Sequence, residues 1–170
     1  MTSSTVDDVD PQTARTAWWI RTVGTVTLLG VIGAALLGAF GTRTAEASAT
    51  QDGWTVSVRH AAVARAGLDV PVTITVHRAG GFDDDVVVAV TSDYLRFLDQ
   101  QSTGPEPAEQ TRDASWTYLT FTPPDGDTLT IDIEAYVRAL HRTDAAGTVA
   151  VVTPDGNLVA PVNIRTRLIP

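Results

Sequence analysis

The sequence predicts a mainly β protein, an antiparallel immunoglobulin-like (Ig-like) β-sandwich of about seven strands preceded by one N-terminal transmembrane helix. Two observations lead to this fold class. A single uncharged apolar run covers residues 22–40, and in most of the chain beyond residue 53 apolar and polar residues alternate with a period of two. Short strands between turns, without a strand–helix–strand rhythm, are typical of a sandwich. A small Greek-key barrel is the alternative.

Four segments follow from this pattern. Residues 1–17 are polar and lack apolar periodicity, which predicts a disordered cytoplasmic tail. Residues 18–41 form the expected transmembrane helix, with Trp18 and Trp19 at the membrane interface. Residues 42–52 are expected to be a flexible tether, and residues 53–170 the sandwich outside the cytoplasm.

The apolar segment has two interpretations. Its nineteen residues suffice to span a bilayer and exceed the roughly 7 to 15 residues of a signal-peptide core, which favours an uncleaved anchor. Arg15 and Arg21 before it, against Arg43 after it, favour a single-pass plasma-membrane protein with a cytoplasmic N-terminus. Alternatively, Ala45-Glu46-Ala47 is a signal-cleavage site, and the mature protein is a secreted β-sandwich starting at Ser48.

Small residues recur every four positions in this segment, at Gly30, Ala34 and Gly38. They share one helix face, and such stripes allow two transmembrane helices to approach closely. The alternative is that a segment rich in Ala and Gly contains this spacing by chance.

Composition excludes several classes of function. The chain has 170 residues, enough for one domain plus an anchor, with 20 acidic residues against 12 basic ones, all of them Arg. From residue 51 onward there are 16 acids and 9 Arg, a net charge of 9 − 16 = −7, which disfavours binding to nucleic acid or to an anionic membrane surface. Without Cys there is no disulfide, thiolate metal site or thiol nucleophile.

The alternating pattern places seven strands in the domain. Their expected ranges are 54–59, 70–77, 86–91, 115–122, 129–138, 148–153 and 158–167. Residues 92–98 are expected to form a helical turn or a crossing segment, and residues 100–113 a polar loop. Trp54 and Trp116 are the expected aromatic anchors of the core.

An apolar group interrupts the strand pattern before that loop, formed by Tyr94, Leu95, Phe97 and Leu98. Large apolar side chains beside a polar loop are typical of a partner-binding patch. The alternative is a plug that closes one end of the sandwich.

No constellation of catalytic or metal-binding residues stands out. His60, His77 and His141 lack metal-ligand spacing and are expected to be ordinary exposed histidines. The acidic groups at residues 83–85 and 125–127 lack the alternating ligand order of a calcium loop, so solvated turns are the simpler interpretation. There is no G-x-S-x-G elbow. We therefore expect a protein without enzymatic activity or cofactor.

Several short motifs carry a resemblance that covers residues 54–170. They are Ala66-Gly67-Leu68-Asp69-Val70-Pro71, Gly80-Gly81-Phe82-Asp83, Ser92-Asp93-Tyr94-Leu95, Pro105-Glu106-Pro107 and Phe121-Thr122-Pro123-Pro124-Asp125-Gly126-Asp127. On these motifs the chain resembles an uncharacterised group of bacterial single-pass membrane proteins with an Ig-like outer domain, often encoded beside YetF-like membrane proteins. The resemblance implies an accessory role and assigns no activity or functional residue.

Three functions remain open after this reasoning. The first is a non-catalytic, membrane-anchored accessory or protein-interaction subunit of the cell envelope, whose partner is another integral membrane or envelope protein. The second is a module that binds envelope glycan or Ca²⁺, through residues 83–85 or the outward-facing Tyr136. The third is the secreted sandwich.

Overall fold

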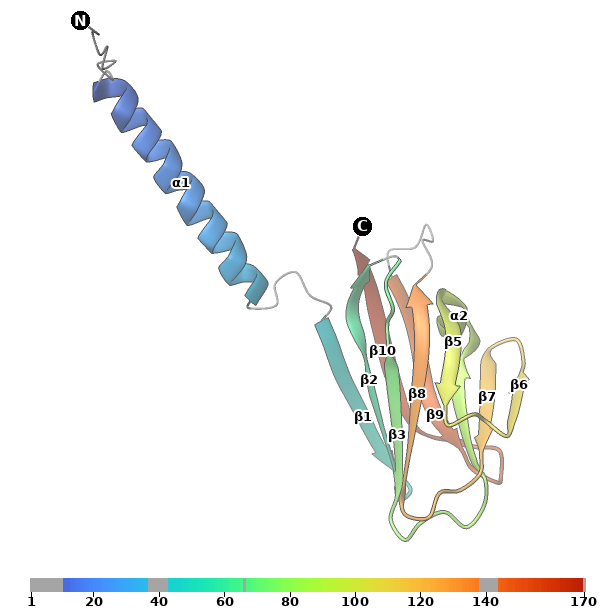
Figure 1. Ribbon diagram of the computed structural model, residues 1–170. Helices are drawn as coiled ribbons and strands as arrows, with labels where there is room; N and C mark the ends of the chain where they lie inside the picture. Colours follow the sequence, from blue (N-terminus) through green and yellow to red (C-terminus); the bar gives the residue numbers. More distant parts are fainter. Residues whose placement is uncertain (1–10, 37–42, 66, 138–143, 170) are drawn as a thin grey trace, which may run out of the picture. The chain divides into compact units, whose positions relative to one another are not determined.

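The computed structural model describes residues 11–36, 43–65, 67–137 and 144–169. The chain divides into two compact units, Met1–Gly41 and Thr42–Pro170. The first contains one helix and the second a β domain (Figure 1). The mainly β class with one apolar N-terminal helix is therefore confirmed.

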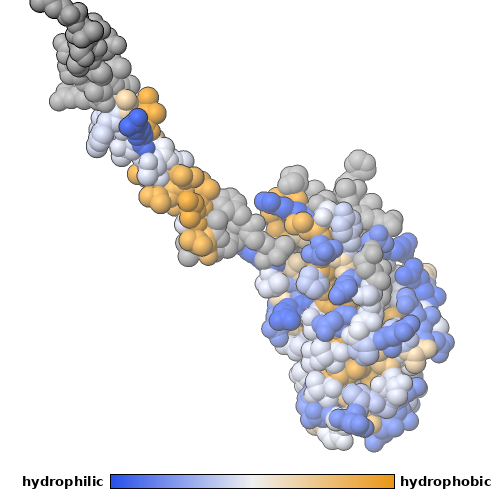
Figure 2. Space-filling view, in the orientation of Figure 1, coloured by the Kyte–Doolittle hydropathy of each residue, from blue (hydrophilic) through white to orange (hydrophobic). Residues whose placement is uncertain are grey.

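Helix α1 extends over Pro11–Leu36 and begins earlier than expected. Residues 11–17, expected to be part of a disordered tail, are helical, and Pro11 occupies the first helical position, where its missing N–H is tolerated. The rest of the expected tail, residues 1–10, lies outside the described residues. Within α1, the window Ala17–Ala34 has a mean hydropathy of 1.3, and the helix is long and apolar enough to cross a membrane. Figure 2 shows apolar side chains exposed along α1.

The described part of the β domain forms ten strands and one short helix. These are β1 (Arg43–Gln51), β2 (Trp54–Arg65), β3 (Val72–Arg78), β4 (Val86–Thr91), α2 (Ser92–Phe97), β5 (Leu98–Gly104), β6 (Glu109–Arg112), β7 (Trp116–Phe121), β8 (Thr128–Val137), β9 (Asp144–Val152) and β10 (Leu158–Ile169).

All ten strands belong to one curled, mixed sheet. Its order is β5-β8-β3-β2-β10-β9-β4-β7-β6, and β1 pairs with β2 off this path. Strand β2 is antiparallel to β3 over residues 54–59 and then runs parallel to β10 over residues 63–65. The expectation of a purely antiparallel sheet of about seven strands is therefore wrong on both counts.

The three strands missing from the sequence-based prediction are β1, β5 and β6. Strand β1 occupies the expected tether, and β5 and β6 occupy most of the expected polar loop. None carries a strong apolar alternation. Every side chain of β6 is exposed, and β1 presents only small residues to its half-buried face. Such edge strands are held by backbone pairing, which leaves little trace in the sequence.

The core lies inside the curl of the sheet and is built from alternate residues of the strands. In β8 the pattern is complete, because Leu129, Ile131, Ile133, Ala135 and Val137 are all buried, as the alternation predicts. All core residues that the structure describes lie between Trp54 and Ile164, so the domain has a hydrophobic core of its own.

The two expected aromatic anchors differ. Trp54 is buried and packs against Phe82, with ring centroids 5.9 Å apart. Trp116 is only half buried. Side chains alternate along β7, and it is Thr117 and Leu119 that face the core. Its expected anchoring role is wrong, because the strand register places its side chain on the other face.

Candidate functional site

The expected partner patch is not on the surface. Its four residues are all buried, and at most 4% of the surface of any one of them is exposed: Tyr94, Leu95, Phe97 and Leu98. The segment forms α2 and the start of β5, and its residues belong to the hydrophobic core. The alternative interpretation, a plug at one end of the sheet, is the one that the structure supports.

A buried hydrogen-bond chain fixes this plug. The Tyr94 hydroxyl lies 2.9 Å from Thr166 Oγ1, and Thr166 donates to the Ala61 carbonyl at 2.8 Å. Because the Thr166 hydrogen is used in that second bond, the Tyr94 hydroxyl is the donor in the first. Burial raises the pKa of Tyr94 above its usual value. These contacts give the tyrosine a structural role.

The stripe of small residues on α1 lies partly within the described residues. Gly30 is exposed, and a Cβ atom there would meet nothing within 4 Å, while Ala34 is half-exposed. Gly38 lies outside the described residues. A docking role for the stripe remains a prediction.

The histidines do not form a site. His60 is buried in β2, and its Nδ1 atom has no hydrogen-bond partner among the described residues. The expectation that it is exposed is wrong, although His60 continues the inward alternation of Trp54, Val56 and Val58, a signal that identifies its face. His77 lies 3.2 Å from Thr128 Oγ1, and His141 lies outside the described residues.

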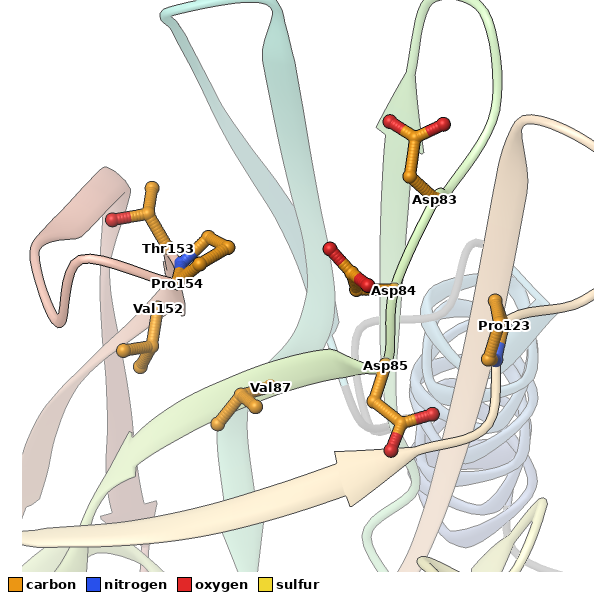
Figure 3. A pocket seen from close by; sticks show the side chains of 8 residues that line it. All are labelled: Asp83, Asp84, Asp85, Val87, Pro123, Val152, Thr153 and Pro154. Atoms are coloured by element: carbon orange, nitrogen blue, oxygen red, sulfur yellow. The ribbon is translucent and has the colours of Figure 1, made fainter.

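A shallow cavity of about 670 Å³ lies beside the acidic turn before β4 (Figure 3). Its lining comprises Asp83, Asp84, Asp85, Val87, Pro123, Val152, Thr153 and Pro154. The three carboxylates point in different directions in Figure 3, and Asp83 pairs with Arg78 at 3.4 Å. Within the part of the chain that the structure describes, no three His, Asp or Glu side chains are grouped to hold a metal ion. This geometry does not favour the calcium interpretation.

A second cavity, of about 580 Å³, lies on the outer side of β2, β9 and β10. It is lined by Ala62, Asp144, Arg165 and Arg167. Arg165 donates through Nε to Asp144 Oδ2 at 3.1 Å. Arg167 is exposed, and no described carboxylate lies within ion-pair distance of it. Sequence reasoning missed this basic surface because the net charge of the domain is negative.

One exposed carboxylate has a clear structural function. Asp113, in the β6–β7 turn, accepts hydrogen bonds from the Ser115 and Trp116 amides at 2.7 and 2.6 Å and from the Tyr118 hydroxyl at 2.9 Å. The amide of Trp116, then that of Ser115, and then the Tyr118 hydroxyl lower the pKa of Asp113. The bond to Asp113 raises the pKa of Tyr118. This arrangement holds a hairpin turn.

Comparison with known proteins gives only low similarity, to solved structures. No family model and no curated protein matches the chain. A cohesin module from a Clostridium perfringens family 33 glycoside hydrolase aligns over 73% of this chain and 98% of that one, with 5% identity and a TM-score of 0.47. Pseudomonas fluorescens alkylpurine DNA glycosylase AlkC aligns over 62% of this chain and 28% of that one, with 14% identity and a TM-score of 0.33. A Vibrio harveyi GH20 exo-β-N-acetylglucosaminidase aligns over 70% and 18%, with 12% identity and a TM-score of 0.34.

Proposed function

We propose that this chain is a non-catalytic, membrane-anchored accessory or interaction subunit of the cell envelope. In this proposal α1 crosses the plasma membrane, the N-terminus is cytoplasmic and the β domain lies outside. The observation that carries it is the window Ala17–Ala34, none of which is buried within the structure. Apolar side chains exposed over such a length are stabilised when a bilayer covers them, which supports the anchor.

Strand β1 argues against the secreted alternative. Cleavage after Ala47 would cut β1 in the middle, between Ala47, paired with Val58, and Ser48, paired with Ser57. The residues removed would include 43–47, which pair with β2 as far as Val63. A mature protein starting at Ser48 would lose half of an edge strand and leave part of β2 without its neighbour. The uncleaved anchor keeps the sheet intact.

The proposed partner is another integral membrane or envelope protein. Gly30 and Ala34 are available for helix packing, because nothing in the described part of the chain covers Gly30. The accessory role also agrees with the resemblance to single-pass proteins encoded beside YetF-like membrane proteins.

The curled sheet is best classed, in our proposal, as a variant of the Ig-like sandwich. Its support is the single core shared by β2, β3 and β8 with β4, β7, β9 and β10. The parallel contact of β2 with β10 is the departure from an antiparallel sandwich.

Purification of the full-length protein from its native membrane, with and without crosslinking, tests the accessory function. We expect an integral membrane partner to copurify, and the double variant Gly30→Leu/Ala34→Leu to reduce its recovery if the stripe is the contact. Gly24→Leu is the matched control, since Gly24 is as exposed as Gly30 and meets nothing within 4 Å, but lies on another face of the helix by the helical period. Recovery of the protein alone after crosslinking would contradict the proposal. A mature N-terminus at Ser48, determined by mass spectrometry of the same sample, would contradict the anchor.

A further inference from the structure

Charge is distributed unevenly between the two ends of the β domain. At the end where β1 leads into β2, the turns carry Asp52, residues 83–85, Asp125, Asp127 and Asp155. Strand pairing places these turns at one end of the sheet. The end of β3 pairs with the starts of β2 and β8, and the end of β9 pairs with the starts of β4 and β10. Among the described residues, Arg78 is the one arginine there. We call this the acidic end (lower in Figure 1).

The opposite end carries arginines from three neighbouring strands. Arg43 and Arg167 each pair with Val63 of β2, and Arg65 lies two residues further along that strand. All three side chains are exposed, and no described carboxylate is within ion-pair distance of them. We call this the basic end.

The basic end also exposes apolar side chains. Outside α1, four large apolar residues of the described chain are exposed, and three lie here: Leu68 at 46%, Tyr136 at 38% and Ile169 at 42%. They adjoin the arginines, since the Leu68 amide donates to the Arg65 carbonyl at 3.4 Å and Ile169 pairs with Arg65. The backbone of Leu68 also bonds Val137, next to Tyr136. Cationic and apolar groups side by side are the combination that a charged lipid interface favours.

We propose that the basic end docks on the anionic headgroups of the bilayer that holds α1. Arg43, Arg65 and Arg167 bind lipid phosphate, and Leu68, Tyr136 and Ile169 enter the interface. The orientation rests on the proposed anchor. Seven residue steps lead from Leu36 to Arg43, and a chain of that length spans at most about 25 Å, so a bilayer that holds α1 is within that reach of Arg43.

The net negative charge of the domain does not oppose this docking. Strand β8, with 10 residues, is about 33 Å long, whereas charges in physiological salt are screened over about 8 Å. The aspartates of the acidic end are therefore several screening lengths from the lipid surface. At the basic end itself, Asp144 is ion-paired with Arg165, and Asp69 and Asp99 lie opposite Tyr136. The arginines there, Arg43, Arg65, Arg165 and Arg167, therefore exceed these carboxylates by 4 − 3 = 1.

The absence of Cys allows a direct test with the full-length protein. Leu68→Cys is labelled with a membrane-impermeant, polarity-sensitive fluorophore after reconstitution, so that only outward-facing domains report. Leu158→Cys is the matched control, because Leu158 is 40% exposed and lies at the acidic end. The vesicles are phosphatidylcholine alone or phosphatidylcholine mixed with phosphatidylglycerol, and flotation measures membrane association.

The fluorescence emission of the label at position 68 should shift to shorter wavelength in anionic vesicles, whereas the emission of the label at position 158 should not shift. High salt, or the triple variant Arg43→Gln/Arg65→Gln/Arg167→Gln, should abolish the shift, since each arginine near an anionic surface strengthens binding by about fivefold. Equal signals at both positions, or a shift independent of anionic lipid, would overturn docking.

Flotation separates this proposal from the anchor. A chain that floats with neutral vesicles but shows no shift at position 68 keeps the anchor and overturns docking. A chain that floats only with anionic vesicles, in a salt-sensitive way and with the shift, keeps docking and overturns the anchor. Flotation with neither kind of vesicle overturns both.

Discussion

Gly147 of β9 lies directly against Tyr94 of α2. A Cβ atom built on Gly147 would lie 2.6 Å from the Tyr94 Cβ atom and 2.8 Å from its Cγ atom, well inside the roughly 3.5 Å of a normal carbon contact. The missing side chain at position 147 therefore allows α2 to close over β9. This contact keeps Tyr94 in the core and away from any partner.

The variant Gly147→Ala should lower the free energy of unfolding by about 1 to 3 kcal/mol, because the new methyl group displaces α2 from the core. Urea denaturation followed by tryptophan fluorescence measures the change. Gly104→Ala is the control, since a Cβ atom there meets nothing within 4 Å, and it should not destabilise the domain. Equal stability of the Gly147→Ala variant and the wild type would show that α2 moves at no cost.

Thr166→Val should lower the free energy of unfolding by about 1 to 3 kcal/mol, because it leaves the buried Tyr94 hydroxyl and the Ala61 carbonyl without their partner. Thr166→Ser keeps both hydrogen bonds and should lower the free energy of unfolding by less. Adding Tyr94→Phe to Thr166→Val should recover part of the loss, since the unpaired hydroxyl is then gone. Strictly additive effects in this double-mutant cycle would contradict the coupling.

Alkaline pH should destabilise the domain through Tyr94. Burial raises the pKa of Tyr94 above the unfolded value of about 10, so its contribution is complete below that pH and is lost as the pH rises further. Urea midpoints between about pH 9 and 11 should fall more steeply for the wild type than for Tyr94→Phe. The pH dependence that remains in the Tyr94→Phe variant includes the ionisation of Tyr118, whose pKa is also raised. Identical slopes would exclude the role of Tyr94.

Acid should destabilise the β6–β7 hairpin through Asp113. The pKa of this carboxyl is lowered, so its contribution is present above the unfolded value of 3.8 and disappears as the pH falls through the folded value. Asp113→Ala should therefore be less stable than the wild type at neutral pH and nearly equal to it in strong acid. Chemical denaturation across this range provides the measurement, with Asp155→Ala as an exposed turn control. A difference independent of pH would indicate a role for the side chain other than its charge.

His60→Leu should raise the free energy of unfolding by about 1 kcal/mol. The substitution removes a buried Nδ1 atom that has no hydrogen-bond partner among the described residues and keeps an apolar side chain of similar size. His77→Leu, at a half-exposed position, should change the free energy of unfolding by less than about 0.5 kcal/mol. A loss of stability in His60→Leu would show that the imidazole makes a favourable contact.

The sequence predicts the strands that have one buried face. In β8 the alternation from Leu129 to Val137 identifies both strand and facing, and the charge-free run of α1 identifies the apolar helix. Local pattern suffices in these elements because burial itself imposes the period. The same alternation continues to His60, but the expected strand ended at residue 59, so the sequence-based prediction placed this buried histidine on the surface.

Other features depend on which strands become neighbours, and only the tertiary structure decided them. Strand β1 exists because β2 offers it an edge, and Tyr94 is buried because Gly147, 53 positions later in the chain, leaves room for it. The basic end arises in the same way, since Arg43, Arg65 and Arg167 meet only through the pairing of β1 and β10 with β2. A net charge or a local period contains no information about such long-range pairing, because backbone hydrogen bonds are common to every residue type.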